Sequence, residues 1–382
     1  MTGAALLALA ACASPAPPPA PAPPPAAAAA DSAAPPAAVE LLATWELSTG
    51  HRAGDTEVGG LSALAWDPDG GLFHALSDDR GEAPRRGPAR LYALRLVPGE
   101  GTPLGGVEVA AVTALRSDGA PLPAGRIDLE GLAFAGAEGF WIASEGVAGR
   151  DEPPFVRLFG RDGAERAALP VPARFFPARG RGVRDNLGFE ALAITPDGGH
   201  LIAGVESALV QDGPPATDDR PALVRLVVWD LVAGEPVAEH AYAVDPLPWP
   251  SALPGTFRVS GLVELVALDR RRLLALERAF AAHRGNALKL YRVDLAAAGD
   301  VSAVESLAAA GAALRPAAKE LLFDVGAALA RRGVALDNLE GMAFGPDLPD
   351  GRRLLLLVAD NNFSSGQRTL FVALAVPPEA LE

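Results

Sequence analysis

Residues 129–134 read LEGLAF, and this pattern of a polar residue, a small residue and a short apolar run occurs five times along the chain. The other copies are LSALAW (61–66), FEALAI (189–194), VSGLVE (259–264) and LEGMAF (339–344). Each copy continues through a turn, PDGG in two of them, into a second apolar run that closes on an acidic residue. Proline and glycine in such turns suit the tight backbone of a β-hairpin. The repeat therefore predicts five related hairpins.

Further strand-like runs follow the hairpins, such as 90–96 with 107–115 and 223–231 with 236–244. Four strands per unit in up-and-down order describe one blade of a β-propeller. The last unit supplies a single late run, 369–376, and residues 39–47 can provide its missing strand. Pairing of the two terminal strands would close the ring and remove its free sheet edges. We therefore predict an all-β propeller.

The spacing of the repeats sets the number of blades. Successive copies lie 60 to 80 residues apart, which predicts five four-stranded blades and leaves room for a degenerate sixth. Helical spacing of Leu321, Leu322, Val325 and Leu329 predicts one helical insert near 317–333.

The N-terminal residues indicate where the protein is sent. An apolar run at 4–11 ends in LAAC (9–12), and this sequence resembles a bacterial lipobox, although no Lys or Arg precedes it. The run is far shorter than the ~20 residues that span a bilayer. We expect residues 1–12 to form a lipoprotein-type signal segment with lipidation at Cys12, and the location to be periplasmic or cell-surface and lipid-anchored. Residues 13–38 contain 13 Ala and 10 Pro and are predicted to be a linker, followed by one folded domain at 39–382.

Composition excludes several classes of function. The chain has 33 basic and 47 acidic residues and a formal net charge of −14, which argues against nucleic acid as a partner. Cys12 is the single cysteine, so the sequence offers neither a disulfide framework nor a thiolate zinc site. Membrane contact is expected only through the lipid anchor.

Acidic residues recur at the same two positions of the hairpins. A polar residue opens the first strand and an acid closes the second strand 15 to 20 residues later. In a hairpin these positions lie at one sheet edge, and the innermost strands of a propeller line its central channel. We therefore expect the following acids to converge near the axis: Asp78, Glu130, Glu145, Glu190, Glu206, Glu277, Glu340 and Asp360.

Carboxylates this close together raise one another's pKa unless a positive charge balances them. Calcium suits such a site because it takes six to eight oxygen ligands. The metal ligands that we predict are Asp78, Glu145, Glu206, Glu277 and Asp360, with amide oxygens from Asn338 and Asn361. The residues that we assign to catalysis are Glu130, Glu190, Glu340, Arg80 and Arg278.

Two readings of these charges stay open. Arg80 and Arg278 each follow a strand-end acid and could neutralise the acids in place of calcium. Each acid could also simply accept backbone N–H bonds and hold the blades together. The arginines at 174, 179, 181 and 184 either reach the channel mouth to bind an anion or lie in a solvated loop.

The stretches DNLEGMAFGP (337–346) and ADNNF (359–363), with DLEG (128–131) and NLGFEA (186–191), resemble the bacterial family described as having esterase-like activity of phytase. The resemblance covers roughly residues 55–376. It implies a secreted or periplasmic phytase-like propeller with phosphomonoester or ester hydrolysis, and it carries over no catalytic residue. Ser62 and Ser260 replace the Glu of the repeat in blades one and four, which argues against a fully symmetric metal site.

The function that we predict is a calcium-dependent hydrolase of a small-molecule phosphoester or ester, with a carboxylate as general base. A calcium-dependent lactonase would use the same acids. The alternative from another class is a non-catalytic, membrane-tethered binding or scaffold propeller whose acids are structural. We expect a monomer in either case.

Overall fold

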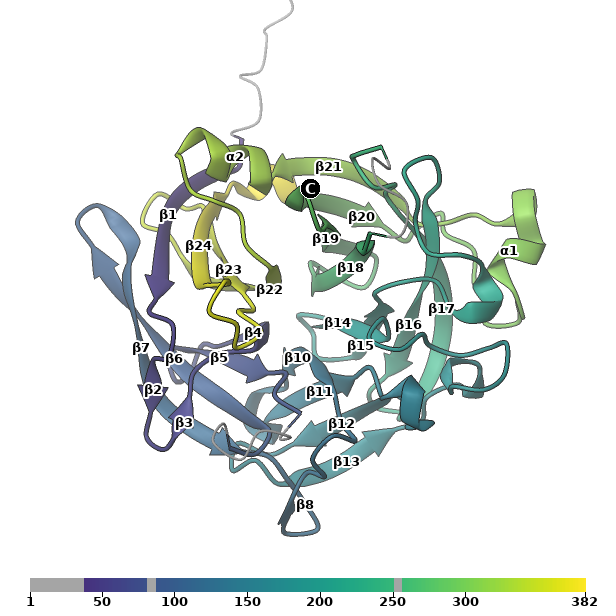
Figure 1. The fold of residues 1–382 in the computed structure, drawn as a ribbon, viewed down its shortest axis with the longest axis horizontal. Coiled ribbons are helices and arrows are strands. Elements are labelled where there is room, and N and C mark those ends of the chain that lie inside the picture. Colours follow the sequence, from purple (N-terminus) through teal and green to yellow (C-terminus); the bar gives the residue numbers. More distant parts are fainter. Residues whose placement is uncertain (1–37, 81–86, 251–255) are drawn as a thin grey trace, which may run out of the picture. The chain divides into compact units, whose positions relative to one another are not determined.

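The computed structural model describes residues 38–80, 87–250 and 256–382. Five four-stranded antiparallel sheets stand around a central axis as the blades of a propeller (Figure 1). In the described ranges no sixth four-stranded sheet is present, so the prediction of five blades is confirmed. The predicted signal segment with Cys12, and the linker up to residue 37, lie outside the described residues.

Four of the blades follow chain order from the innermost strand outward. Blade one contains β4 (Leu61–Asp67), β5 (Leu72–Ser77), β6 (Arg90–Gly99) and β7 (Thr102–Ala114). Blade two contains β10 (Leu129–Phe134), β11 (Phe140–Ser144), β12 (Phe155–Phe159) and β13 (Glu165–Leu169). Blade three contains β14 (Phe189–Ile194), β15 (His200–Val205), β16 (Ala222–Asp230) and β17 (Glu235–Val244). Blade four contains β18 (Arg258–Ala267), β19 (Arg272–Ala281), β20 (Gly285–Asp294) and β21 (Ala318–Asp324).

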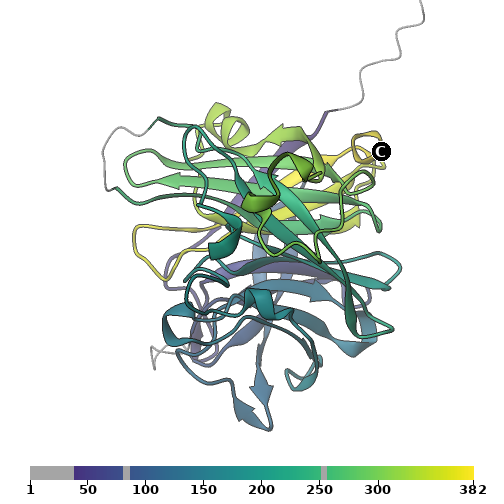
Figure 2. The same cartoon turned by 90° about the vertical axis from the view of Figure 1, so that its right-hand side faces the viewer.

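Blade five closes the ring. It contains β22 (Leu339–Asp347), β23 (Arg353–Ala359), β24 (Thr369–Val376) and, as its outermost strand, β1 (Glu40–Leu47) from the other end of the chain. The β1–β24 pairing is antiparallel and runs from Glu40↔Ala375 to Leu47↔Thr369. The predicted closure by the terminal strands is therefore confirmed. Seen from the side, blue strands of blades one and two lie at one end and green and yellow strands of blades four and five at the other (Figure 2).

Short elements complete the chain. Two-stranded ribbons are formed by β2 (Arg52–Ala53) with β3 (Thr56–Glu57) and by β8 (Arg116–Ser117) with β9 (Ala120–Pro121). The α-helices are α1 (Leu307–Ala310) and α2 (Val325–Arg331), and short 3-10 turns occur at Gly136–Glu138, Ala148–Arg150, Ala173–Phe175, Val210–Asp212, Gly311–Ala313 and Pro378–Leu381. None of the helices in the described ranges has the length and apolar character needed to cross a membrane.

The predicted helical insert is only half correct. Residues 318–324 form the outermost strand of blade four, in which Lys319 pairs with Val293 and Leu321 with Tyr291. The helix begins at Val325, where the Asp324 carboxylate caps it by accepting the N–H of Ala327 at 2.7 Å. The apolar spacing looked helical, but hydrogen bonds to the open edge of β20 decide the conformation because β-structure depends strongly on its neighbours.

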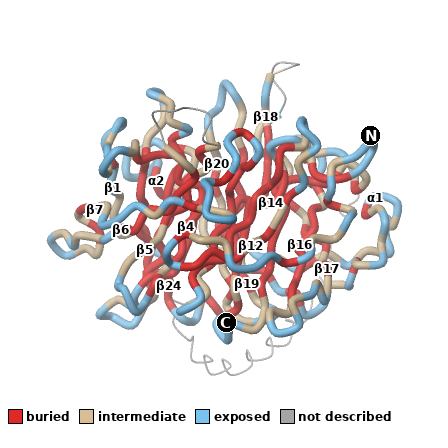
Figure 3. The backbone as a smooth tube through the Cα atoms, turned by 90° about the horizontal axis from the view of Figure 1, so that it is seen from below, coloured by how far each residue is buried: buried red, intermediate tan, exposed pale blue. Residues whose placement is uncertain are grey.

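The core lies between the blades, and the exposed backbone is largely in the turns at either face (Figure 3). Neighbouring blades approach most closely at their innermost strands, which explains the glycine of the repeat. A Cβ atom at Gly131 would stand 2.7 Å from the Cβ of Leu192, and one at Gly341 would stand 2.9 Å from the backbone of Ala63. A side chain at these two positions would push adjacent blades apart.

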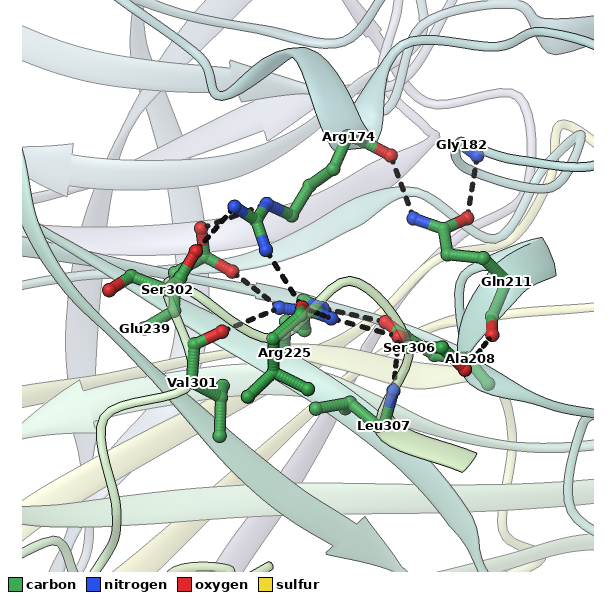
Figure 4. Close-up of polar contacts among 12 residues, drawn as sticks. Arg174, Gly182, Ala208, Gln211, Arg225, Glu239, Val301, Ser302, Ser306 and Leu307 are labelled. Carbon is green, nitrogen blue, oxygen red and sulfur yellow. Dashed lines mark hydrogen bonds and ion pairs between the residues drawn. The ribbon is translucent and has the colours of Figure 1, made fainter. Parts of the chain in front are cut away.

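A buried ionic network fastens the segment around α1 to blade three (Figure 4). The fully buried Arg225 guanidinium binds the Asp212 carboxylate at 2.6 and 2.9 Å and the Glu239 carboxylate at 2.9 Å. It also donates to the carbonyl oxygens of Val301 and Val304. One arginine thereby holds two carboxylates and a loop that crosses from blade four.

Candidate functional site

One end of the central channel opens into a cavity of about 590 Å³ with mainly charged walls. All five blades contribute, through residues near the start of the innermost strand or near the end of the second strand. The fourteen lining residues are Asp78, Asp79, Arg80, Asp128, Glu130, Glu145, Asn186, Glu190, Glu206, Arg278, Glu340, Asp360, Asn362 and Phe363. Nine of them are carboxylates and two are arginines, and the nine include seven of the eight acids that we expected near the axis, all except Glu277.

A β-bulge sets the position of the acid in the innermost strand. In β10 the pairing passes from Leu129↔Ser144 to Gly131↔Ala143, which leaves Glu130 as the extra residue. The same irregularity falls at Ser62, Glu190 and Glu340 in β4, β14 and β22. A bulge re-aims a side chain and strengthens the local twist. The repeat thus places one residue per blade at the same point of the channel wall.

The acid after the second strand is fixed by its own backbone. The N–H groups of Asp78, Glu145, Glu206 and Asp360 donate to carbonyl oxygens of Gly60, Asp128, Gly188 and Asn338, at 2.8 to 3.0 Å. Each acceptor lies two residues before the bulged residue. The hairpin therefore brings the two acids of a repeat together, as their spacing in the sequence predicts.

Blade four departs from the alignment that the sequence suggested. Its bulge falls at Val263, not at Ser260, because the pairing passes from Leu262↔Glu277 to Glu264↔Leu276. In the other blades, an acid follows the second-strand residue that pairs with the residue just before the bulge. In blade four this position is held by Arg278, because Leu262 pairs with Glu277. Ser260 therefore sits three residues too early, and Glu277 one residue too early, to take the positions predicted for them.

Glu277, a predicted metal ligand, does not line the cavity. Its carboxylate accepts hydrogen bonds from the Tyr242 hydroxyl at 2.5 Å and the Asp245 N–H at 2.9 Å, and it pairs with the Lys319 ammonium. Arg278 takes its expected place and pairs with the carboxylates of Glu340 and, at 3.3 Å, Glu206. A fixed cation thus interrupts the ring of acids at blade four.

Arg80 is the second cation of the cavity. Its guanidinium makes a bidentate contact with the Asp128 carboxylate, with Nε at 2.8 Å from Oδ1, and also donates to Asn186 Oδ1 at 2.6 Å. Planar, two-point pairing of this kind fixes orientation as well as charge. Arg80 therefore joins residues that precede the inner strands of blades two and three.

The asparagines predicted as ligands have other contacts. Asn338 accepts from Arg278 and donates from Nδ2 to Glu340 Oε1 at 3.0 Å. Asn361 Oδ1 accepts the N–H groups of Gly60 and Phe363, so it shapes the loop while Asn362 lines the cavity. The arginine run is not in the cavity lining, since Arg174 and Arg184 donate to backbone carbonyl oxygens elsewhere.

Asp128 is the residue that the repeat comparison missed as a site acid. Its carboxylate, with those of Glu130 and Glu145, forms a buried triad in which one oxygen from each lies within 4.8 Å of the others. The only signal in the sequence is that DLEG (128–131) has a second acid just before the strand. Glu190 lies next to this triad in the lining, and its carboxylate accepts no hydrogen bond within the described part of the chain.

Burial and mutual repulsion act on these acids in the same direction. Desolvation, followed by the charge of Glu340, raises the pKa of Asp78 to about 7. Desolvation also raises the pKa of Glu206 to about 7, against the opposing effect of Arg278. The pKa values of four further carboxyls are held well above their usual range by desolvation and neighbouring acids: Glu130, Glu145, Glu190 and Asp360. Two arginines do not offset nine carboxylates.

With this geometry known, the chain can be compared with other proteins. The sequence model of the phytase-like family, described as esterase-like activity of phytase, matches residues 56–363. The chain belongs to this phytase-like family. The match includes every strand of blades one to four, the two inner strands of blade five and every residue that lines the cavity.

Individual relatives of the phytase-like protein are distant. A secreted protein of Arthroderma benhamiae, described as uncharacterized, is 27% identical over 143 residues, which are 31% of this chain and 27% of that protein. Among solved structures, the periplasmic gluconolactonase PpgL of Pseudomonas aeruginosa is similar with a TM-score of 0.34 and 15% identity, covering 85% of this chain and 90% of that one. A putative oxidoreductase (glucose dehydrogenase) of Thermus thermophilus has a TM-score of 0.35 and 14% identity, covering 87% and 99%.

At the opposite end of the channel in the phytase-like propeller, the innermost strands present apolar side chains. One aliphatic side chain from each innermost strand lies two residues beyond the bulge and lines a second cavity of about 870 Å³: Leu64, Leu132, Leu192, Leu265 and Met342. In blades two, three and five the wall thus changes from a carboxylate to hydrocarbon within two positions of the innermost strand. This second cavity also has charged residues in its lining, namely Glu138, Asp197 and Arg353, but the innermost strands contribute only apolar side chains to it.

Proposed function

We propose that this phytase-like protein is a hydrolase of small-molecule phosphoesters or carboxylic esters that holds a calcium ion at the propeller axis. The observation that carries the proposal is the buried triad of Asp128, Glu130 and Glu145, whose oxygens lie within 4.8 Å of one another. The triad lines a cavity of about 590 Å³, large enough to admit a substrate beside the ion.

The donor set fits calcium. Calcium takes six to eight oxygen ligands in flexible geometry, and the lining supplies carboxylate and amide oxygens. The described lining contains neither His nor Cys, the ligands that zinc and copper favour. Desolvation and, after it, the charges of neighbouring acids hold the pKa values of Glu130 and Glu145 well above their usual range, and a divalent cation would offset both effects. Asp78, Glu206 and Asp360 stand in the same lining as further oxygen donors.

When bound, calcium supplies Lewis-acid polarisation of a phosphoryl or carbonyl oxygen. Residues of the chain itself would transfer the proton and orient the substrate. Glu190 has a raised pKa and no hydrogen bond from the described chain, so its carboxyl group is suited to take a proton from an attacking water and later return it. Arg80 and Arg278 present guanidinium groups to the cavity and would orient an anionic substrate.

The alternative function is a binding or scaffold propeller that catalyses nothing. It is favoured by the contacts that some acids make between blades: Glu145 of blade two accepts the N–H of Gly188 from blade three at 2.6 Å, and Arg278 of blade four binds Glu340 of blade five. In this alternative the acids hold the ring together. A lactone is a further substrate class that the same acids could serve.

The test uses the full chain and compares Glu130→Gln with Glu235→Gln, an exposed control. Melting curves are recorded with calcium and with EGTA, and hydrolysis of p-nitrophenyl phosphate, p-nitrophenyl acetate and δ-valerolactone is followed. A ligand at 100 times its Kd stabilises a fold by about 2.7 kcal/mol. We expect a calcium-dependent rise in Tm and turnover in the wild type and the control, and the loss of both in Glu130→Gln. A calcium shift without turnover of any substrate would favour the binding propeller, and no shift at all would refute the metal site.

Cellular location is a separate proposal. We propose that Cys12 carries a lipid and that the Ala- and Pro-rich residues 13–38 tether the propeller outside the cytoplasm. Metabolic labelling with an alkynyl fatty acid tests this for the wild type and for Cys12→Ala. Label on the wild type alone is the expected result, and equal or absent labelling of both would refute the anchor.

A further inference from the structure

Phe363 has an unusual backbone conformation at the edge of the charged cavity. Two consecutive residues after β23, Asn362 and Phe363, have φ values of 46° and 51°. Asparagine tolerates this left-handed region, but a bulky aromatic residue there is a genuine outlier. Such conformations persist where the surroundings over-determine them, and they gather at functional sites.

The surroundings of Phe363 do fix it. Asn361 Oδ1 accepts the N–H of Phe363 at 3.0 Å and that of Gly60 at 3.1 Å, which joins two loops 301 residues apart in sequence. Asp360 Oδ1 accepts the N–H of Asn362 at 2.7 Å. The loop is thus held by side chains that point back onto its own backbone and onto blade one.

The ring itself lies against bare backbone. A Cβ atom at Gly60 would stand 2.7 Å from Phe363 Cε2, and one at Gly59 would stand 3.0 Å from Cδ1 and Cε1. The same Cβ at Gly60 would also clash with Asp78 Oδ1. The glycine pair therefore leaves space for the aromatic ring and for a cavity carboxylate next to it.

Phe363 differs chemically from everything around it. Of the fourteen lining residues it alone has an apolar side chain, since the others are acids, arginines and asparagines. Its ring also stands 5.9 Å from the guanidinium of the buried Arg90. The left-handed backbone, the glycine pair and the hydrogen bonds to the loop thus fix the position of Phe363. Its ring is the one aromatic surface in a cavity wall whose other side chains are charged groups or amides.

Resting on the proposed hydrolase function, we propose that Phe363 is a specificity-determining residue that selects substrates with a flat ring next to the ester or phosphoester group. An aromatic face attracts the face or edge of another ring, and pairs of this kind add about a tenfold preference. The polar group would lie among the acids and arginines while the ring lies on Phe363.

The test compares one substrate ratio between protein variants, so that the difference in leaving-group chemistry, which is the same for every variant, cancels. We compare kcat/KM for phenyl phosphate and ethyl phosphate, and for phenyl acetate and ethyl acetate, in the wild type, Phe363→Leu, Phe363→Tyr and Phe257→Leu. The last is a control at an exposed phenylalanine. The ratio of phenyl to ethyl substrate should fall about tenfold in Phe363→Leu and stay unchanged in the tyrosine and Phe257 variants. An equal ratio in all four proteins would overturn the proposal.

A binding measurement separates this proposal from the hydrolase function. Phenylphosphonate and ethylphosphonate cannot be hydrolysed, and their dissociation constants are measured by calorimetry in the presence of calcium. Tighter binding of phenylphosphonate that disappears in Phe363→Leu, without turnover of any ester, would refute the hydrolase and leave the ring-binding role in place. Turnover with the same phenyl-to-ethyl ratio in the wild type and in Phe363→Leu would refute the role of Phe363 alone.

Phe363→Asn tests whether the ring serves only to pack the loop. Asparagine suits the left-handed backbone, so we expect this variant to melt within about 2 °C of the wild type while the phenyl preference is lost. A large fall in melting temperature with an unchanged phenyl-to-ethyl ratio would show that Phe363 is structural, and the proposal would then fail.

Discussion

Replacement of Arg278 by glutamine tests the electrostatic balance of the cavity. Arg278 is 8% exposed and pairs with Glu340 and Glu206. Its removal leaves two buried carboxylates without their cation, a change that typically costs about 3–5 kcal/mol. With an unfolding entropy of about 2.1 cal/mol/K per residue, the 344 residues of 39–382 give about 0.7 kcal/mol/K. The expected fall in melting temperature is therefore about 4–7 °C in EGTA.

The loss of stability in Arg278→Gln should depend on pH. Glu206 has a folded pKa raised to about 7, and Arg278 opposes that rise, so its loss moves the pKa still higher. A raised folded pKa means that stability is present below the unfolded pKa and is lost as pH rises through the folded pKa. The deficit of Arg278→Gln should therefore be small near pH 5 and largest near pH 8. In the presence of calcium, calorimetry should show that part of the lost melting temperature is restored, since a divalent cation replaces the missing positive charge.

The control for this experiment is Arg284→Gln, which removes an exposed guanidinium. It should leave the melting temperature unchanged across the same pH range. If Arg278→Gln melts like Arg284→Gln at pH 8 in EGTA, then the acids of the cavity are not under mutual repulsion. That outcome would refute the charge argument on which the calcium site rests.

Three further predictions concern buried charges outside the cavity. Lys319→Met should lower the free energy of unfolding by about 3–5 kcal/mol, because Glu277 then keeps a buried charge without its partner. In denaturant unfolding, the double variant with Glu277→Gln should recover much of the lost stability. Equal stability of the single and double variants would contradict this prediction. Arg225→Met should cost a similar amount and increase hydrogen exchange at the Leu307 amide, which donates to Asp212; unchanged exchange there would show that the network does not hold the α1 segment. Burial raises the pKa of Glu264 well above its usual range. The melting temperature of the wild type should therefore fall relative to that of Glu264→Gln as pH rises from about 5 to 9. The same pH dependence of the melting temperature in both proteins would refute the raised pKa.

The sequence was sufficient to predict the closed ring of five blades and the position of most cavity acids, because both depend on a local sequence pattern. The hairpin repeat fixes two positions per blade, and the distance between Glu130 and Glu145 along the chain already places them side by side. Asp128 was missed since it precedes the strand and has no counterpart acid in the other blades, where Gly60, Gly188 and Asn338 stand. Phe363 gave no signal because its importance lies in a backbone angle that residue types do not disclose.

Blade four shows why a repeat alignment can misplace a residue. The first five residues of VSGLVE follow the same order of residue types as the other copies, yet the bulge falls three residues later. Register is decided by which residues are buried between neighbouring blades, and here Leu265 lies with the aliphatic residues that occupy this position in the other blades. Glu264 consequently takes the place that Gly131 has in blade two, and its carboxylate accepts the N–H of Leu192 at 3.3 Å from blade three.

This shift gives the cavity two unlike sides. Blade two contributes the triad of Asp128, Glu130 and Glu145, where oxygen ligands are densest. Blade four contributes Val263 at the bulge and Arg278 after the second strand, so it adds no acid to the lining and one fixed cation. A symmetric ring of carboxylates would bind cations alone. A ring in which one blade exchanges its acid for an arginine offers a fixed positive charge as well as oxygen ligands, which the proposed hydrolysis of a phosphoester would use to orient an anionic group beside a bound cation.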